Sequence, residues 1–540
     1  MSRKFSNFEV LNKKILNPML SDKVTNIFSE IGKFFKENDA TSAMNAIMDT
    51  AKVLRLSEKR LFGSETRCNC KLTQMQLLEL LLLFPCFMIR NAYNYSKSSL
   101  GGKFRCKSDT FYRFLSNESY DWRRIMAIVS LQLWRKTQQE RTTDSTEPVC
   151  LMVDDTDYPK TGMQTELIGK IYSHVTHSMM LGFKGLFIGI TDGISQMLLD
   201  FALVGEEGKK GNYGLKQKQL DARFSKEHAA DSHTAKRIEE YNQSKIALMM
   251  EMIRRIIKRK IHFDYILADS WFACAEIIKF ITSRHVKCHY LGMIKMSRTK
   301  YVYKGREYTA NQLVALFDHP KKGRTYSRRL GCYHITVDVI FAGRNVRLFF
   351  CKRGKRAKWN GLITTNRALD FIEAYRIYSK RWSLEVIFKE GKGHLGLGKY
   401  QMRNFSSQIA MTAITAMQYN ILSTAKRFSD YETIGGLFMD ATRGSVEITL
   451  TERIWGMILE IVREIAECFN IEDEQILDML VNRSDKLSHF VEIYQLKRNH
   501  PIFDVPLYNH CGTILSRTVP QWLCCRGLLF VLEFLSHLVG

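Results

Sequence analysis

Two short apolar runs, each ended by an aspartate, place the strongest limit on how this chain can fold. Residues 149–153 (Val-Cys-Leu-Met-Val) precede Asp154, and residues 265–268 (Tyr-Ile-Leu-Ala) precede Asp269. Runs that are this short and continuously apolar are typical of strands buried on both faces. We therefore expect two central strands with the aspartates at their carboxyl ends.

The segments around these strands predict a mixed α/β core. Two apolar runs at 182–204 flank Asp192-Gly193, a dipeptide that favours the tight turn of a β-hairpin. A basic helix is expected at 235–260, and another helix at 274–282, after the second aspartate. A hairpin followed by alternating strands and helices is the order of a mixed α/β fold.

Changes in sequence pattern divide the chain into five parts. Residues 1–145 are predicted to be helical, and their basic and aromatic residues suit a DNA-binding region, with a plain helical cap as the alternative. The core is expected at 146–285 and again at 361–428, on either side of a β-rich basic insertion at 286–360. Residues 429–540 are expected to be helical, and their apolar content suits a dimerisation surface.

The net charge of the chain favours a polyanionic partner. Its 80 Lys and Arg residues outnumber 55 Asp and Glu residues, which gives +25 at pH 7. A charge this large is unfavourable in a compact protein unless a partner neutralises it. Nucleic acid is the obvious candidate, because neutralised phosphates release condensed counterions. Ribosomal and membrane-surface proteins share this charge balance, so charge alone does not decide.

The cysteines and the N-terminus predict a cytoplasmic protein that does not enter a membrane. The 13 cysteines show neither a bridging pattern nor zinc-ligand spacing, which suits a reducing compartment. No apolar run follows the first charged residues, so no signal peptide is apparent. The apolar stretch at 77–89 is too short to span a bilayer, and charges break the one at 523–539.

A helix expected at about 368–389 places four polar side chains on one stripe. Tyr378, Arg381, Glu385 and Lys392 are spaced at i, i+3, i+7 and i+14, and they fall within about 60° of one another on a helical wheel. A phenol, a guanidinium, a carboxylate and an ammonium would then face one partner. A plain salt bridge between Arg381 and Glu385 explains part of this pattern. The glycines on either side of Lys392 could end the helix before it.

Three acidic residues from separate elements could bind metal ions together. Taken alone, Asp154 or Asp269 reads more simply as a strand-end turn or a helix cap. Together with Glu385 on the helix, they provide the carboxylates that phosphodiester chemistry with two metal ions requires. Mg²⁺ prefers a few carboxylates together with substrate phosphate, so three such residues are sufficient.

These residues also resemble the motifs of a known family. Tyr378-x2-Arg381-x3-Glu385-x6-Lys392 matches the YREK signature of a large group of bacterial insertion-sequence transposases of the DDE type. Asp154-Asp155-Thr156 resembles the first acidic motif of that group, and Leu267-Ala-Asp269-Ser-Trp271 resembles the second. The parts follow in the same order, and the resemblance spans roughly residues 105–425.

The resemblance implies a fold and a site. The core would be an RNase H-like (retroviral integrase-like) α/β fold interrupted by the β-rich insertion. Asp154, Asp269 and Glu385 would be the catalytic metal ligands for Mg²⁺, with Mn²⁺ as a substitute. Tyr378, Arg381 and Lys392 would contact DNA phosphates near the cut end. Asp155 stays open as the first metal ligand; Asp154 is preferred because the family motif usually reads Asp, any residue, then Ser or Thr.

The resemblance also implies a function. The chain would be a DNA transposase that cleaves at the terminal inverted repeats of a mobile element and joins the freed 3′-OH ends to target DNA. Two ends must be processed together, so the active species would be a homodimer in a synaptic complex. Two alternatives remain: a structure-specific nuclease on the same fold, and a non-catalytic DNA-binding protein such as a decayed transposase or a repressor.

Overall fold

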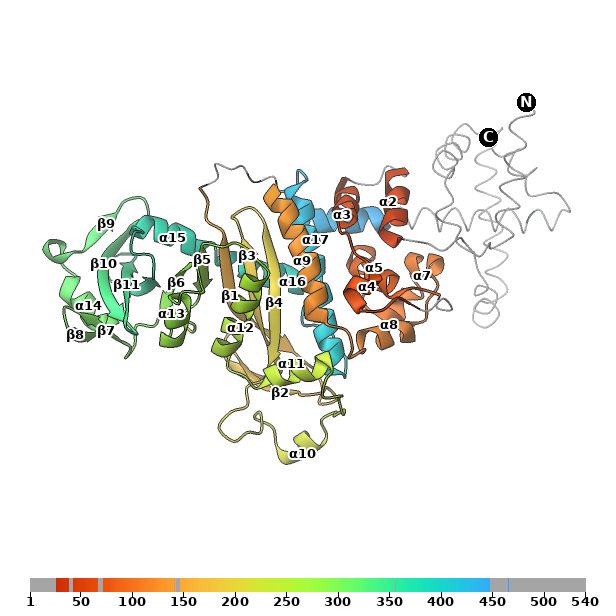
Figure 1. Cartoon of the computed structure of the whole chain (residues 1–540), viewed down its shortest axis with the longest axis horizontal. Helices are drawn as coiled ribbons and strands as arrows, with labels where there is room; N and C mark the ends of the chain where they lie inside the picture. The colour runs from red at the N-terminus through yellow and green to blue at the C-terminus, as the bar shows by residue number, and fades with distance from the viewer. Residues whose placement is uncertain are drawn as a thin grey trace, which may run out of the picture. The chain divides into compact units, whose positions relative to one another are not determined.

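The computed structural model describes residues 26–37, 42–66, 71–139, 141, 146–354, 356–446 and 465. The chain divides into two compact units, and Figure 1 shows their elements. The larger unit comprises residues 49–85 and 109–438. Most of the region expected to be helical at 429–540 lies outside the described residues, and so do residues 1–25. No helix in the described part is long and apolar enough to cross a membrane.

The smaller unit contains short helices in its described part. A buried tyrosine organises one of its segments, because the hydroxyl of Tyr95 donates to the carbonyl oxygens of Leu100 and Phe104 at 3.3 and 2.6 Å. The elements in or at the border of this unit are α2 (Ile27–Glu37), α3 (Ser42–Lys52), η1 (Pro85–Phe87), α6 (Ala92–Tyr95) and α7 (Ser99–Lys103).

The larger unit is built on one mixed sheet of twelve strands within the described residues. The strand order is β2-β3-β1-β5-β6-β12-β11-β10-β7-β8, with β4 paired to β3 and β9 paired to β10. The strands are β1 (Cys150–Pro159), β2 (Gly169–Ser173), β3 (Ser178–Thr191), β4 (Gln196–Val204), β5 (Tyr265–Ala268), β6 (His289–Ile294), β7 (Lys300–Tyr303), β8 (Arg306–Thr309), β9 (Thr325–Ser327), β10 (Cys332–Phe341), β11 (Arg344–Lys352) and β12 (Asn360–Thr364).

The two central strands predicted from the apolar runs are confirmed. β1 and β5 are parallel neighbours, with Cys150 opposite Tyr265 and Val153 opposite Ala268. β1 is longer than its apolar run because it continues to Pro159 by antiparallel pairing with β3. Since Val153 and Ala268 are the last pair, Asp154 and Asp269 follow side by side where this parallel pairing ends. Asp269 is at the carboxyl end of its strand as predicted, whereas Asp154 lies inside β1 rather than at its end.

The hairpin predicted around Asp192-Gly193 is also confirmed. β3 and β4 pair antiparallel from Thr191 opposite Gln196 to Lys184 opposite Val204. Gly193 has a φ of 94°, a left-handed conformation that glycine adopts without strain. Asp192 closes the turn, because its carboxylate accepts the backbone N–H groups of Ile194 and Ser195 at 3.0 and 2.8 Å.

The basic insertion extends the core sheet. β12 pairs antiparallel with β6, and β11 and β10 follow it in the sheet. Helix α15 (Phe371–Ser379) then packs on this part of the sheet through buried apolar side chains. Its Phe371, Ala374 and Ile377 join a core cluster with Leu267 of β5 and Phe349 of β11.

Helices cover both faces of the hairpin region (Figure 1). α9 and α17 pack on β4 and on each other, and α12 packs on β3 and β4. The remaining helices of the larger unit are α4 (Glu58–Phe62), α5 (Gln74–Leu83), α8 (Ser108–Leu115), α9 (Trp122–Gln139), α10 (Gln217–Asp221), α11 (His233–Tyr241), α12 (Lys245–Lys258), α13 (Ala275–Ile281), α14 (Ala310–Phe317), η2 (Pro320–Lys322), α16 (Trp382–His394) and α17 (Phe405–Arg427).

Two helices predicted as single elements are broken in the structure. The expected helix at 235–260 is α11 followed by α12, and Ser244 caps the second by accepting the backbone N–H of Ala247 at 3.1 Å. The expected helix at about 368–389 is α15 followed by α16. At that break the backbone N–H groups of Lys380 and Arg381 donate three residues back, to Ile377 and Tyr378, which tightens the turn.

A buried ion network ties α9, α11 and α12 to β4. Asp200 of β4 is 1% exposed and accepts the Nε atoms of Arg123 and Arg255 at 2.9 and 2.7 Å. Arg123 also donates to both carboxylate oxygens of Glu240 at 2.7 and 2.8 Å. Burial alone would raise the pKa of Asp200, but the two arginines outweigh it and hold the pKa below its ordinary value.

Removing the charge of Asp200 should destabilise the larger unit strongly. Asp200→Asn leaves Arg255 without its carboxylate partner and Arg123 with Glu240 alone. Breaking a buried pair typically costs about 3 kcal/mol or more. We expect a loss of that size in the free energy of unfolding, measured by urea denaturation at neutral pH. Asp231→Asn, a change at an exposed position, is the control and should shift the free energy by less than about 0.5 kcal/mol.

Candidate active site

The candidate site lies where β5 ends beside the middle of β1. Asp154 lies within β1, and its side chain faces α16. Asp269 directly follows β5, where its carboxylate accepts the backbone N–H of Trp271 at 2.9 Å. The parallel pairing of β1 with β5 places the two acids on neighbouring strands. The structure therefore brings these two predicted residues to one edge.

An arginine joins the first acid to the third. Arg381 donates through Nη1 to Oδ2 of Asp154 at 2.6 Å and through Nη2 to Oε1 of Glu385 at 2.5 Å. The side chains of Asp154, Arg381 and Glu385 are 21%, 15% and 33% exposed, so the bridge is largely shielded from water. The guanidinium therefore places one positive charge between two of the three predicted metal ligands.

The alternation of side chains along β1 separates Asp154 from Asp155. The carboxylate of Asp155 accepts Lys245 Nζ of α12 at 2.5 Å and lies 3.9 Å from Lys184 Nζ of β3. Successive residues of a strand point to opposite faces of the sheet. Asp155 is thus ion-paired on the α12 side, whereas Asp154 lies with Arg381 and Glu385. This arrangement favours Asp154 for the role that the sequence left open.

The two remaining predicted DNA contacts also lie around this edge. Lys392 donates from Nζ to the hydroxyl of Thr156 at 2.6 Å, on the same side of β1 as Asp154. The guanidinium of Arg381 lies 5.9 Å from the ring centre of Tyr378. Lys392 is inside α16, which runs past both neighbouring glycines to His394, so the glycines do not end the helix before it.

Burial shifts the pKa values of these groups. It raises the pKa of Asp154 to about 7; Arg381 opposes this shift, and the nearby charges of Asp269 and Asp155 add to it. Burial also raises the pKa of Tyr378 to about 12. Burial lowers the pKa of Lys392, while the charge of Asp157 opposes that shift. A cluster of acids at a partly desolvated edge is typical of functional sites.

The carboxylates of Asp154, Asp269 and Glu385 suit a hard divalent cation chemically. In this conformation, however, they do not converge on one point. Carboxylate oxygens are the ligands that Mg²⁺ prefers, and the bridge made by Arg381 shows that Asp154 and Glu385 attract a cation between them. Among the described residues, no three His, Cys, Asp or Glu side chains converge into a metal-binding group. Arg381 would have to move for these carboxylates to meet at one ion.

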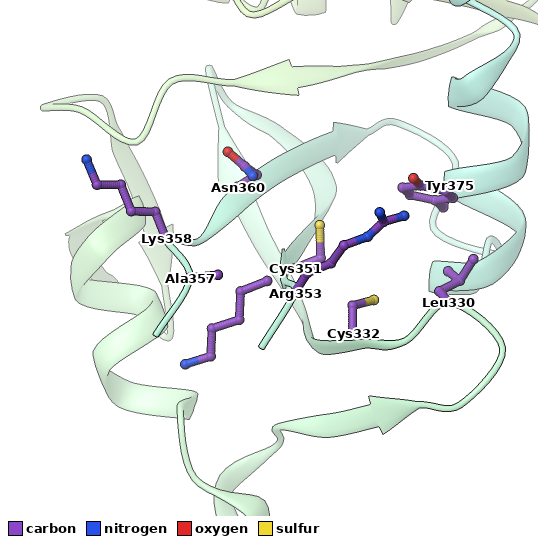
Figure 2. A pocket seen from close by; sticks show the side chains of 9 residues that line it. Leu330, Cys332, Cys351, Arg353, Ala357, Lys358, Asn360 and Tyr375 are labelled. Carbon is purple, nitrogen blue, oxygen red and sulfur yellow. The ribbon is translucent and has the colours of Figure 1, made fainter. Parts of the chain in front are cut away.

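A separate hollow lies in the insertion. It has a volume of about 390 Å³, and Figure 2 shows basic, polar and sulfur-containing side chains around it. No carboxylate lines it, so it does not offer the acidic oxygens that the sequence predicted. Its lining residues are Leu330, Cys332, Cys351, Lys352, Arg353, Ala357, Lys358, Asn360 and Tyr375.

Residues that the sequence did not single out also contribute to the edge. Lys245 and Lys184 neutralise acids on the α12 side of β1, and Lys184 is 2% exposed. Lys184 interrupts the apolar run at 182–204, and a charged residue in such a run is the sequence feature that could have predicted a buried ion pair. Trp271 lies inside the second acidic motif and is 55% exposed. Its exposure could not be read from the sequence.

The raised pKa of Asp154 predicts a pH dependence of stability. In the absence of divalent metal, the folded state binds a proton at Asp154 up to about pH 7, whereas the unfolded chain releases it near pH 4. This contribution to stability is complete below pH 4 and is lost as the pH rises to 7. Between pH 5 and pH 8, wild type should therefore lose about 2 kcal/mol relative to Asp154→Asn, measured by urea unfolding in chelator. A constant difference between the two proteins would contradict the assignment.

Comparison with known protein families adds two matches. Residues 93–312 match the DDE superfamily endonuclease, a range that includes Asp154 and Asp269. Residues 228–421 match the transposase DDE domain, a range that includes Asp269 and Glu385. No curated protein matches the chain.

Two solved structures resemble the chain at low identity. One is piggyBac transposase in a synaptic complex with hairpin DNA, at 10% identity and a TM-score of 0.40, covering 80% of this chain and 83% of that one. The other is the NurA nuclease from Sulfolobus solfataricus, at 10% identity and a TM-score of 0.21, covering 46% of this chain and 82% of that one. The two family matches, taken together, support a DDE-type transposase domain within residues 93–421 of this chain.

Proposed function

We propose that this chain is a metal-dependent DNA transposase of the YREK group of bacterial insertion sequences, acting in the cytoplasm. It would cut DNA at the terminal inverted repeats of its element and join the freed 3′-OH ends to target DNA. The observation that supports this most directly is the bridge from Asp154 through Arg381 to Glu385, beside Asp269 at the same sheet edge. Arg381 and Glu385 belong to the YREK signature, and Asp154 and Asp269 belong to the two acidic motifs.

The order of strands supports an RNase H-like core. β3 lies between β4 and β1 and is antiparallel to both, and β1, β5 and β6 are parallel neighbours. α16, which includes Glu385, packs against β1. Acids from two adjacent parallel strands and from a helix packed beside them would then face one substrate phosphate.

Asp154, Asp269 and Glu385 would hold the divalent metal ions, Mg²⁺ or its substitute Mn²⁺. Bound there, such ions would polarise the scissile phosphate and lower the pKa of the attacking water. Burial keeps the carboxylate of Asp154 poorly solvated, so its negative charge is readily neutralised by a cation. The backbone N–H of Trp271 orients Asp269 toward this edge.

Arg381, Lys392 and Tyr378 would hold the DNA strand that is cut. The guanidinium of Arg381 can form two parallel hydrogen bonds to a phosphate, and the ammonium of Lys392 can neutralise a second one. The ring of Tyr378 lies 5.9 Å from the guanidinium of Arg381, so both could contact the same strand. The overall charge of +25 would favour the approach of DNA.

Cutting two element ends and joining both requires two sites, so we propose that the active species is a homodimer bound to both ends. The regions at 1–145 and 429–540, both predicted from the sequence to be helical, remain the proposed DNA-binding and pairing regions. A nuclease of the same chemistry would cut DNA without joining it. A non-catalytic DNA-binding protein would do neither.

Replacing Glu385 tests the assignment of the acids. Glu385→Gln keeps the size of the side chain and its hydrogen bonding but removes a metal-binding charge. With the element's own ends and Mg²⁺, we expect wild type to cut and to join, and the variant to lose at least about a thousand-fold in cleavage rate while still binding DNA. Asp154→Asn and Asp269→Asn should behave in the same way.

Two nearby acids serve as controls for this experiment. Glu390→Gln changes the same helix, where Glu390 accepts the hydroxyl of Tyr419 at 2.9 Å. Asp155→Asn changes the neighbour of Asp154, which is paired with Lys245 on the other face of β1. Both variants should keep cleavage within about ten-fold of wild type. Cleavage by Glu385→Gln at the wild-type rate would refute the proposed third ligand. Cutting by wild type without joining would indicate a nuclease.

Arg381→Gln tests whether the guanidinium occupies the position of the proposed metal ion. Without metal, the variant leaves Asp154 and Glu385 unneutralised, so its thermal midpoint in chelator should fall by about 2 °C or more. Millimolar Mg²⁺ alone should then raise the midpoint of the variant more than that of wild type, because no arginine competes for the carboxylates.

Arg376→Gln is the matched control for this measurement. Arg376 is in α15, its side chain is 40% exposed, and it pairs with Glu147 rather than with a candidate ligand. Its response to Mg²⁺ should equal that of wild type. If Mg²⁺ stabilises Arg381→Gln no more than it stabilises the control, the guanidinium does not occupy the position of the cation.

A further inference from the structure

An exposed tryptophan lies beside the candidate acids. Trp271 is 55% exposed, although it directly precedes Phe272, which is 1% exposed. Its backbone N–H donates to Oδ1 of Asp269 at 2.9 Å, so the loop that presents the indole is tied to a candidate metal ligand. A large exposed aromatic side chain that is fixed at a functional edge offers a flat apolar surface to a partner.

Two lysines flank this indole. Lys295 Nζ, just after β6, lies 4.8 Å from the ring centre of Trp271, and Lys245 Nζ of α12 lies 5.8 Å from it. Lys245 is held in place by its ion pair with Asp155 at 2.5 Å. The side chain of Lys295 is exposed, and within the described part of the chain no carboxylate pairs with it. Lys295 is therefore free to give way to a ligand, whereas Lys245 is anchored.

Basic side chains continue from the indole along one loop. Lys295, Arg298 and Lys300 follow one another at the end of β6 and the start of β7, and all three are exposed. An aromatic face bordered by exposed cations is the combination with which proteins bind single-stranded nucleic acid, since the ring stacks on a base and the cations neutralise phosphates.

We propose that Trp271 stacks on an unpaired base of the DNA substrate beside the candidate acids. Lys295 would move off the ring to a flanking phosphate, and Lys245 would stay as the fixed cation on the α12 side. The base must be unpaired, because both faces of a paired base are already covered by its neighbours in the duplex. This inference deepens the proposed function, on which it rests, by naming distorted or single-stranded DNA as the form bound at this edge.

The test compares two DNA probes in chelator, so that no cleavage is involved. One probe is a continuous duplex of about thirty base pairs, and the other is the same duplex with a short single-stranded gap in one strand. Fluorescence anisotropy measures both affinities at one salt concentration. Wild type should bind the gapped probe more tightly. Trp271→Ala should lose about ten-fold in affinity for the gapped probe and keep its affinity for the duplex, because stacking contributes only to the unpaired base.

Two further variants separate stacking from folding. Trp271→Phe keeps an aromatic face and should retain most of the preference for the gapped probe. Tyr172→Ala removes another exposed aromatic side chain, on β2, and should leave both affinities unchanged. The thermal midpoints of all three variants should match wild type, since each change is at an exposed position.

A fluorescent base gives a readout that a merely structural role would not change. With 2-aminopurine in the gap, binding of wild type should quench its fluorescence through stacking on the indole, and binding of Trp271→Ala should not. Equal affinities of wild type for the two probes would overturn the proposal. An equal loss of affinity for both probes in Trp271→Ala would also overturn it. The same holds if Trp271→Ala changes the self-association of the protein and leaves both affinities unchanged.

These outcomes are independent of the test of the proposed function. Binding in chelator needs neither metal nor cleavage, so a preference for gapped DNA that depends on Trp271 can hold even if wild type cuts no element end. Conversely, metal-dependent cutting and joining by wild type, together with a gap preference that does not depend on Trp271, would leave the proposed function standing and remove this inference.

Discussion

This structure depends on the pairing of carboxylates on the sheet with cations from other elements. A carboxylate withdrawn from water is costly unless a cation and hydrogen bonds replace the water. Asp200 meets this requirement through Arg123 and Arg255, which hold its pKa low. At Asp154, Arg381 offsets only part of the cost of burial, so the pKa of Asp154 is raised to about 7. In the first case the carboxylate is enclosed, and the cations hold helices to β4. In the second case the carboxylates of Asp154 and Glu385 are partly exposed, and the proposed metal ion would replace Arg381 there.

β1 carries acids on both faces because successive side chains along a strand point to opposite faces of the sheet. Asp154 and Thr156 face the side of α16, where they contact Arg381 and Lys392. Asp155 faces the other side and pairs with Lys245. A shift of one residue in the pairing of β1 would exchange these sets. The antiparallel pairing of β1 with β3 over ten residues therefore fixes which acid faces Arg381 and which one pairs with Lys245 of α12.

Local sequence patterns predicted the strands and the hairpin, but they did not predict the breaks in the helices. The runs before Asp154 and Asp269 are continuously apolar because both faces of β1 and β5 are covered, so hydrophobicity alone identifies them. The break between α15 and α16 depends on partners distant in sequence: Lys380 reaches the carbonyl of Pro148 at 3.0 Å, and Arg381 reaches Asp154. A helical wheel assumes one straight helix and takes no account of such distant partners. The four side chains of the predicted stripe are therefore divided between α15, the break and α16.

The position of Arg381 bears on the order of events in the proposed reaction. In the structure the guanidinium bridges Asp154 and Glu385, so its single positive charge is shared between two carboxylates. A metal ion that bound these carboxylates would take over that role and leave the guanidinium without a partner. A DNA phosphate is the anion that could then receive it in bidentate form. A metal ion that took the carboxylates would free Arg381 for a phosphate, and a phosphate that took Arg381 would free the carboxylates for a metal ion. Metal binding and DNA binding would therefore favour one another, and neither ligand alone would satisfy all the charges at this edge.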